Sequence, residues 1–391
     1  MLDRLGALGD PLDERHRLNE ILEAVGPLDL LARLGPLRQG LEAAGDVGIS
    51  EFHQRHAPSV VEDRRAEAPY PVGMERSPTT RLAPTPSGAL HVGNARTFLV
   101  NWALARTLGW RIVLRLEDLD LGRVKDGAHA AALEDMRWIG VDWDGEPEIQ
   151  SRDLAPYCEA LSKLAAAGRT FRCDRSRAEI RSAASAPHAE DGETRYPPEL
   201  RPPEPWVREI DAWGTDSWQA NHRIRIDPAP EQVRDEFLGE RVFDPGLEAG
   251  DLVVWTKLGV PAYQLAVVVD DARHGVTDVV RGDDLLASAA RQQLIARALG
   301  LPHARWWHVP LVYGDDGKRL AKRHGSHSLA AMRASGVAPE RVIGWCARSL
   351  GLSERRELSA REFLALATPD ALRAAVARVH ALPTVYREGD V

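Results

Sequence analysis

The sequence contains little cysteine. Its three cysteines, Cys158, Cys173 and Cys346, are scattered and form no CxxC pair, which argues against a disulfide framework and fits a reducing compartment. Long apolar runs are also missing. None approaches the roughly 20 residues that span a membrane, and the first residues lack the basic and apolar regions of an export signal. These absences predict a cytoplasmic protein that makes no membrane contact.

Lysine is rare as well. Only five of the 50 basic residues are lysines, and two of them, Lys318 and Lys322, fall within one five-residue stretch. A chain that otherwise uses arginine places two compact ammonium groups there, which indicates a specific need for them. The net charge of −8 does not exclude a nucleic-acid partner, because residues 1–70 hold 13 acidic and 8 basic residues and the remainder is almost neutral.

The pattern of apolar residues changes along the chain. Residues 1–75 are predicted to form a helical N-terminal extension and a proline-rich linker of unknown role. Helices are expected at 91–108, 126–139, 153–168 and 285–299, and in the remainder of the chain. Strands are expected at 111–116, 276–280 and 306–313, and residues 252–255 and 263–269 are strand-like or buried apolar runs. This alternation predicts an α/β fold with a doubly wound, mostly parallel sheet.

The expected domains follow from that reading. Residues 76–335 form the α/β core, with an inserted α+β subdomain at about 170–245 that includes the irregular segment 183–206. Residues 336–391 are expected to be a C-terminal helical segment.

One candidate nucleotide-binding segment covers residues 81–94 and reads RLAPTPSGALHVGN. Its prolines stiffen a loop, and its glycines let the backbone approach a ligand where a helix begins. A histidine and an asparagine three residues apart on the first helical turn can face one phosphate. The residues expected to contact ATP here are Pro84, Gly88, His91, Gly93 and Asn94.

A second segment, residues 317–325, reads GKRLAKRHG. Lys322 is placed to stabilise charge on the α-phosphate during transfer, and Arg319 is a further ATP contact. Taken alone, the first segment also fits an ordinary loop and the second a solvated basic turn. Their occurrence in this order, on an α/β background, predicts a site that holds a nucleoside triphosphate from two sides.

The two segments resemble the HIGH and KMSKS elements of class I aminoacyl-tRNA synthetases, and the first has the form seen in the glutamyl group. Residues 115–120 (RLEDLD), 262–271 (AYQLAVVVDD) and 275–286 (GVTDVVRGDDLL) are similar to further motifs of that group. The resemblance covers residues 79–330, with five motifs in order. It implies a Rossmann-type class I catalytic core that uses ATP with Mg²⁺ and L-glutamate.

The resemblance also implies roles for individual residues. His91 and Lys322 match the catalytic positions. Arg81 and Arg281 would bind carboxylates of glutamate and Glu117 its ammonium group. The positions that match the glutamate contacts of the family are Arg81, Ala83, Thr85, Glu117, Tyr263 and Arg281. Thr85 stands where serine is usual, and Arg319 and Ala321 stand where lysine and serine are common, which leaves the behaviour of that loop open.

Many proteins of this group carry a structural zinc with the ligand spacing C-x-C…Y-x3-C. This chain keeps Cys173 and Tyr196 but has Arg175 and Leu200 at the other two positions. Arginine and leucine cannot complete a tetrahedral zinc site, so no structural zinc or other protein-bound metal is expected.

Only 68 residues follow residue 323, which is short for the separate anticodon-reading domain of a glutamyl-tRNA synthetase. The chain therefore resembles the subgroup that lacks this domain. That subgroup activates glutamate without tRNA and esterifies it onto queuosine in the anticodon loop of tRNA(Asp), which makes this tRNA the expected partner. Two alternatives stay open: a truncated or divergent synthetase that charges a tRNA 3′ end, and a catalytically silent paralogue that acts as a binding module.

Overall fold

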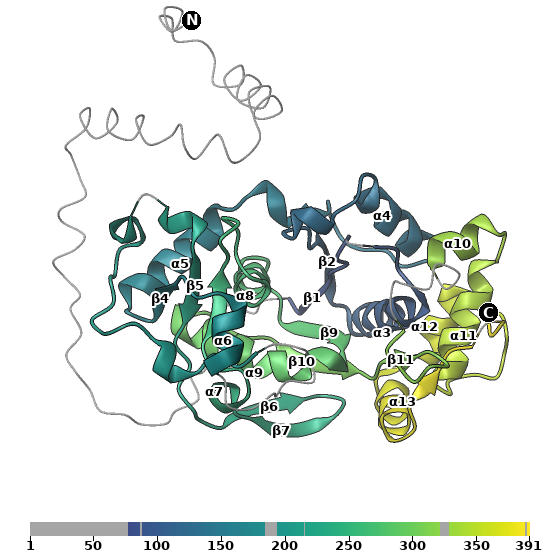
Figure 1. Ribbon diagram of the computed structural model, residues 1–391. Helices are drawn as coiled ribbons and strands as arrows, with labels where there is room; N and C mark the ends of the chain where they lie inside the picture. The colour runs from purple at the N-terminus through teal and green to yellow at the C-terminus, as the bar shows by residue number, and fades with distance from the viewer. Residues whose placement is uncertain (1–76, 87, 184–193, 215, 321–327, 388) are drawn as a thin grey trace, which may run out of the picture. The chain divides into compact units, whose positions relative to one another are not determined.

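The computed structural model describes residues 77–391, apart from residues 87, 184–193, 215, 321–327 and 388 (Figure 1). The chain divides into two compact units, residues 1–69 and 70–391, and all described residues belong to the second. The predicted helical extension and the predicted catalytic Lys322 lie outside the described residues. Of the helices that are described, none combines the length and the apolar character needed to cross a bilayer.

The core is built on two neighbouring sheets, with the strand orders β3-β2-β1 and β9-β10-β6-β7. All paired neighbours run parallel except β6 and β7, which form an antiparallel hairpin. The backbone N–H of Thr277 donates to the carbonyl of Thr79 at 2.8 Å, so β1 lies beside β9. The strands are β1 (Thr79–Leu82), β2 (Arg111–Leu116), β3 (Glu148–Ile149), β6 (Glu231–Asp235), β7 (Gly239–Phe243), β9 (Asp278–Gly282) and β10 (Arg305–Val309).

Helices cover both faces of the parallel strands. On β9, Val280 packs in one apolar cluster with residues of α3, whereas the adjacent Val279 packs with Ala289 and Ala290 of α9. Successive side chains of a strand point to opposite faces, so α3 and α9 lie on opposite sides of the sheet. The prediction of an α/β fold with a parallel sheet is confirmed. Its helices are α3 (Val92–Leu108), α4 (Ala128–Trp138), α5 (Ala155–Ala166), α8 (Tyr263–Arg273) and α9 (Leu286–Leu299).

The C-terminal helices pack against α3, apart from α10 (Leu329–Ala334), which packs against α4 (Figure 1). Trp345 and Phe363 from these helices are buried in the same apolar cluster as Leu99 of α3. A short parallel pair, β11 (Val312–Tyr313) and β12 (Thr384–Val385), connects the end of the chain to the core. These helices are α10 (Leu329–Ala334), α11 (Pro339–Ser349), α12 (Ala360–Leu366) and α13 (Pro369–Ala381).

A separate antiparallel sheet has the strand order β4-β5-β8. In the sequence, its three strands fall between β3 and β9. Its apolar side packs on α5, α8 and α9, where Tyr157, Ile224 and Leu265 share one buried cluster. Two short helices also belong to this region. The elements are β4 (Thr170–Cys173), α6 (Arg177–Ala183), β5 (Asn221–Ile224), α7 (Pro245–Glu248) and β8 (Leu252–Trp255), with short 3-10 turns between them.

Of the two predictions for residues 263–269, the strand is wrong, because these residues begin helix α8, and the buried apolar run is confirmed. Five successive residues, from Leu265 to Val269, are buried, so the segment shows no periodicity that separates a helix from a strand. The predicted strand 306–313 is in fact two strands, β10 and β11, because Pro310 lies between them and has no N–H to donate. Helix α9 ends as predicted, with Gly300 in the left-handed conformation at its C-cap.

Candidate active site

The first nucleotide-binding segment connects β1 to the start of α3, as the sequence predicts. His91 is the N-cap of α3, and its backbone N–H donates to the side-chain oxygen of Asn94 at 3.1 Å. A Cβ atom on Gly93 would lie 3.1 Å from two atoms of the His91 ring, so glycine at this position leaves room for the imidazole. The first turn of α3 therefore presents backbone N–H groups and His91 at one place, which suits binding of an anion.

The second segment is described only in part, and the chain on either side of residues 321–327 has defined contacts. The hairpin after β11 closes with Tyr313 paired to Arg319, and Arg319 binds Asp284 at 2.9 Å. Beyond residues 321–327, which lie outside the described part, the N–H of Leu329 donates to the carbonyl of Leu90 at 2.8 Å, next to His91. The chain that follows the second segment thus contacts the first segment at the start of α3, although the two positions are more than 200 residues apart in the sequence.

A buried ionic cluster lies behind the first segment. Arg115 of β2 is fully buried, and its guanidinium is 2.7 Å from Asp271 and 3.2 Å from Glu117. Asp271 is also 3.5 Å from the Nε of Arg81, whose Nη1 donates to the carbonyl of Val280 at 3.2 Å. Asp271 therefore lies between the guanidinium groups of Arg81 and Arg115, and these contacts fix the positions of two predicted glutamate contacts, Arg81 and Glu117.

Burial raises the pKa of Glu117, and the positive charges of Arg115 and Arg81 oppose that rise. The backbone of Glu117 is held as well, because its N–H donates to the carbonyl of Pro84 in the first segment at 3.1 Å. A carboxylate in this position can accept hydrogen bonds from an ammonium group. Its elevated pKa makes that ability dependent on pH.

Tyr263 and Arg281 are two further predicted glutamate contacts. Tyr263 is the first residue of α8, its ring is 39% exposed, and the charges of Arg281, Glu117 and Arg81 all act on its hydroxyl. Arg281 is buried on β9. The side chains of Arg81, Glu117, Tyr263 and Arg281 are therefore close enough for their charges to interact.

The two remaining predicted glutamate contacts belong to the loop after β1. Ala83 is half-buried there, and Thr85 is exposed. Their contact with a substrate stays a prediction.

Several residues that shape the site were not predicted from the sequence. Arg115 and Asp271 belong to the motifs RLEDLD and AYQLAVVVDD, but their part in holding Arg81 and Glu117 was missed. Asp270, also buried, accepts hydrogen bonds from Gln150 at 2.7 Å and Tyr157 at 2.9 Å. The sequence does place these charged residues inside or next to apolar runs. Because charged side chains are rarely buried without a partner, that position could have indicated that they pair with one another.

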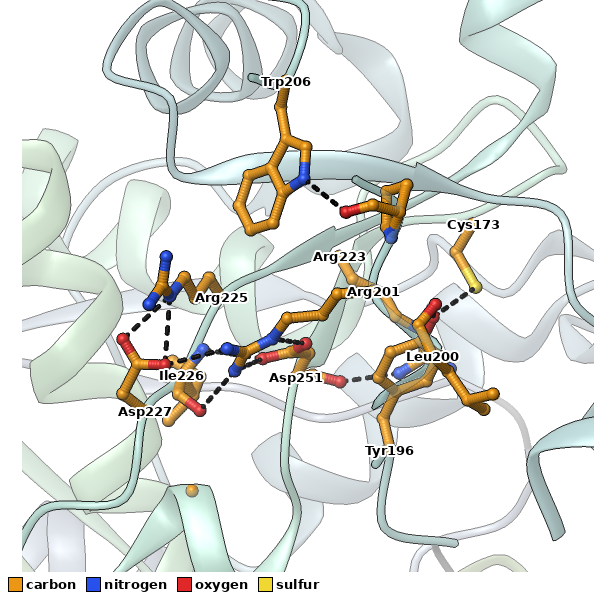
Figure 2. A network of polar contacts seen from close by, with 12 residues as sticks. Cys173, Tyr196, Leu200, Arg201, Trp206, Arg223, Arg225, Ile226, Asp227 and Asp251 are labelled. Atoms are coloured by element: carbon orange, nitrogen blue, oxygen red, sulfur yellow. Dashed lines mark hydrogen bonds and ion pairs between the residues drawn. The ribbon is translucent and has the colours of Figure 1, made fainter. Parts of the chain in front are cut away.

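The region of the missing zinc ligands is closed by aromatic and polar contacts (Figure 2). The thiol of Cys173 faces the hydroxyl of Tyr196 at 3.8 Å, and that hydroxyl donates to the carbonyl of Leu200 at 2.8 Å. Burial raises the pKa of Tyr196, so its hydroxyl is protonated at neutral pH and can donate to Leu200. Arg175 lies 3.9 Å from Glu179. Among the described residues, no three His, Cys, Asp or Glu side chains are grouped to hold a metal ion.

Ionic contacts link the same region internally. Arg201 binds the buried Asp251 through two hydrogen bonds, of 2.7 and 2.8 Å, and the guanidinium of Arg223 lies 4.2 Å from the centre of the Tyr196 ring. Figure 2 shows Arg201, Asp251 and Asp227 beside the Cys173–Tyr196 pair. These contacts can hold the region together without a metal, and the zinc content of the protein stays a prediction.

Comparison with known proteins gives consistent matches. The family model "tRNA synthetases class I (E and Q), catalytic domain" matches residues 78–375. The chain is 45% identical over 292 residues to a glutamyl-Q tRNA(Asp) synthetase of Symbiobacterium thermophilum, covering 71% of this chain and 88% of that protein. It is 40% identical over 296 residues to the protein of the same name from Rhodopirellula baltica, covering 71% and 87%.

A more distant relative and a solved structure are also similar to this chain. A glutamate–tRNA ligase of Methylorubrum extorquens is 38% identical over 294 residues, covering 75% of this chain and 60% of that protein. The crystal structure of a glutamate–tRNA synthetase from Elizabethkingia anophelis superposes with a TM-score of 0.62 at 24% identity, covering 74% of this chain and 65% of that one, which shows a common fold. The chain therefore belongs to the class I tRNA synthetases of the E and Q group, and within that family to the glutamyl-Q tRNA(Asp) synthetases.

Proposed function

We propose that this enzyme activates L-glutamate with ATP, without needing tRNA for that step, and transfers the glutamate to queuosine in the anticodon loop of tRNA(Asp). The observation that carries the proposal is that the chain following the second segment returns to the first one at the start of α3, where the N–H of Leu329 donates to the carbonyl of Leu90 beside His91. The names of relatives that are 45% and 40% identical support the acceptor.

The ionic cluster supports glutamate as the substrate. Arg81 and Arg281 offer forked donors to the two carboxylates, and Glu117 offers an acceptor to the ammonium group. Arg115 and Asp271 hold Arg81 and Glu117 in place through contacts of 2.7 to 3.5 Å. A pocket that contains both signs of charge in fixed positions selects a zwitterion with a second carboxylate.

Activation then needs little from the protein beyond position and charge. An oxygen of the glutamate α-carboxylate attacks the α-phosphorus of ATP in line, the bond to the β-phosphate oxygen breaks, and glutamyl-adenylate and pyrophosphate form. His91, Lys322 and the N–H groups at the start of α3 stabilise the charge that develops on the phosphate oxygens. Mg²⁺, which accompanies ATP, supplies further charge neutralisation on the phosphates.

In the second step, a hydroxyl of the cyclopentene-diol of queuosine attacks the carbonyl carbon of the adenylate. The ester forms and AMP leaves. We assign both steps to residues 76–335, with residues 170–245 as the inserted subdomain and 336–391 as a C-terminal helical segment. The extension at 1–75 has no assigned role.

Two measurements on the full-length protein test this function. Glutamate-dependent ATP–pyrophosphate exchange without tRNA tests the first step, and its strict dependence on tRNA would instead indicate a synthetase that charges a 3′ end. Filter binding of labelled glutamate to tRNA(Asp) with and without queuosine tests the acceptor. A tRNA(Asp) that lacks its 3′-terminal adenosine should still be labelled, and loss of labelling would refute queuosine as the acceptor.

A further inference from the structure

Arg281 is held by three neutral acceptors. Its Nε donates to Nε2 of His308 at 3.0 Å, its Nη1 to the side-chain oxygen of Gln292 at 2.8 Å, and its Nη2 to the carbonyl of Leu285 at 3.0 Å. Its guanidinium also lies over the ring of Trp306, with Cζ 4.9 Å from the ring centre. These bonds use three of the five N–H donors of a guanidinium and leave two for a bound carboxylate.

The bond to Arg281 determines which nitrogen of His308 carries the proton. The Nε of arginine can only donate, so Nε2 of His308 must be the acceptor and Nδ1 must carry the hydrogen. Nδ1 lies 2.6 Å from a carboxylate oxygen of Asp235, which accepts that hydrogen. His308 has no exposed surface, and burial lowers its pKa to about 4. The imidazole is therefore neutral and fixed in one tautomer at neutral pH.

Asp235 is itself fixed by backbone donors. Its Oδ1 accepts the N–H groups of Phe237 at 3.0 Å and Leu238 at 2.8 Å, and its Oδ2 accepts the N–H of His308 at 3.1 Å. Asp235 ends strand β6, which pairs with β10, the strand that carries His308. The hairpin β6–β7 thus delivers a rigid carboxylate to the side of His308 that is remote from Arg281.

A second chain of bonds holds Arg281 from the other side. Gln292 accepts from Arg281 and donates to the side-chain oxygen of Gln264 at 2.9 Å, and Gln264 donates to Ser288 at 3.1 Å. Because Arg281 can only donate, the side-chain oxygen of Gln292 must face it and the amide nitrogen of Gln292 must face Gln264. The same reasoning orients the amide of Gln264, so Arg281 determines the donor and the acceptor in each bond of the series. The guanidinium consequently has one orientation that satisfies every partner.

We propose that His308, oriented by Asp235, is a positioning residue that holds the guanidinium of Arg281 ready to bind a carboxylate of glutamate. This inference rests on the proposed function, since it takes Arg281 as a glutamate contact. A neutral acceptor suits the task, because a carboxylate partner in the place of His308 would compete with the substrate for the positive charge of Arg281. His308 does not touch the substrate and acts only through Arg281.

Three variants separate positioning from packing. His308→Leu removes the acceptor for Arg281. Asp235→Asn keeps an oxygen for Phe237 and Leu238 but turns an N–H toward Nδ1 of His308, which moves the proton to Nε2 and sets two donors against each other at Arg281. His308→Gln retains an acceptor oxygen within reach of Arg281 and is the conservative rescue.

The readout is ATP–pyrophosphate exchange with the concentrations of glutamate and ATP varied separately. His308→Leu and Asp235→Asn should raise the KM for glutamate roughly 10- to 100-fold, the range expected for losing one hydrogen bond to a charged group, and leave the KM for ATP within about threefold. His308→Gln should stay within about threefold of the parent for both substrates. Equal changes in both KM values, or failure of His308→Gln to rescue, would overturn the proposal.

Asp278→Asn is the matched control. Asp278 is equally buried, lies on the neighbouring strand β9 and accepts the ring N–H of Trp307 at 2.9 Å, but it has no bond to Arg281. This variant should leave the KM for glutamate unchanged. If Asp278→Asn raises it as much as Asp235→Asn does, the effect is one of general packing and the proposal is refuted.

A double variant distinguishes failure of this inference from failure of the proposed function. Arg281→Ala should raise the KM for glutamate, and adding Asp235→Asn to it should cause no further change. If Arg281→Ala leaves that KM unchanged, the assigned role of Arg281 is wrong. If Arg281→Ala raises the KM but His308→Leu and Asp235→Asn do not, only the positioning role is wrong.

Discussion

Replacing Arg201 with methionine tests how the region without the usual zinc ligands is held together. Arg201 makes two hydrogen bonds to Asp251, at 2.7 and 2.8 Å, and further bonds to Asp227 at 2.9 Å and to the carbonyl of Ile226 at 3.1 Å. Methionine keeps the apolar stem and removes the guanidinium. The buried side chain of Asp251 would then retain the hydrogen bond that it accepts from the N–H of Ile226 at 2.8 Å.

The expected loss follows from these contacts. Breaking a buried ion pair by removing one partner costs about 3–5 kcal/mol. The Arg201 side chain is 15% exposed, and Asp251 keeps a backbone donor, so we expect a decrease of about 2–3 kcal/mol in the free energy of unfolding. Urea unfolding followed by tryptophan fluorescence and by circular dichroism, both in excess EDTA, measures this decrease.

Arg225→Met is the matched control, because Arg225 lies beside Arg201 in Figure 2 and its carboxylate partners, Asp227 and Glu204, are more than half exposed. Its loss should be about 0–1 kcal/mol. Similar losses for the two variants would refute the view that the Arg201–Asp251 pair stabilises this region. The parent should unfold at the same urea concentration with and without EDTA, and a lower midpoint in EDTA would show that a metal contributes after all.

Three further outcomes are expected. Lys322→Ala should slow glutamyl-adenylate formation by about 10²–10³-fold in single-turnover assays, as loss of a group that stabilises transition-state charge does, and an unchanged rate would refute the two-sided site. In the parent, the KM for glutamate should rise as the pH falls through the raised pKa of Glu117, because protonation of this carboxylate removes the acceptor for the ammonium group. The Glu117→Gln variant should have a higher KM for glutamate at neutral pH, and that KM should no longer depend on pH in this range. Gly344→Ala should destabilise the protein by roughly 1–3 kcal/mol in urea unfolding, since its Cβ would lie 2.0 Å from the carbonyl oxygen of Arg356, and an unchanged midpoint would contradict that packing.

The sequence predicted those elements whose ends are marked by neighbouring residues. Strand β2 and helix α9 have the predicted positions, because a continuous apolar run between charged residues and a helix ended by Gly300 are both local patterns. The approach of the two nucleotide-binding segments was predicted from their resemblance to known motifs and stays a prediction, because residues 321–325 of the second segment lie outside the described part of the chain. Leu329, a few residues further on, bonds to Leu90 of the first segment.

Local sequence patterns did not predict elements that are buried on several sides, or contacts between residues far apart in the sequence. Helix α8 is buried on several sides, so its valines read as a strand. The contact between Asp235 and His308 joins residues 73 positions apart, and the hairpin that supplies Asp235 has no distinctive motif. No local signal in a single sequence predicts such a pair, because only the pairing of β6 with β10 brings the two side chains together.

The three arginines of the site also have different roles that their sequence motifs do not distinguish. Arg115 is fully buried against three carboxylates, those of Asp271, Glu117 and Asp270, so its charge is already compensated. Arg81 shares Asp271 with it at 3.5 Å. Arg281 has no carboxylate within ion-pair distance among the described residues, and burial lowers its pKa, which means that its positive charge is costly until an anion binds. Under the proposed function, a carboxylate of glutamate bound at Arg281 would remove that cost.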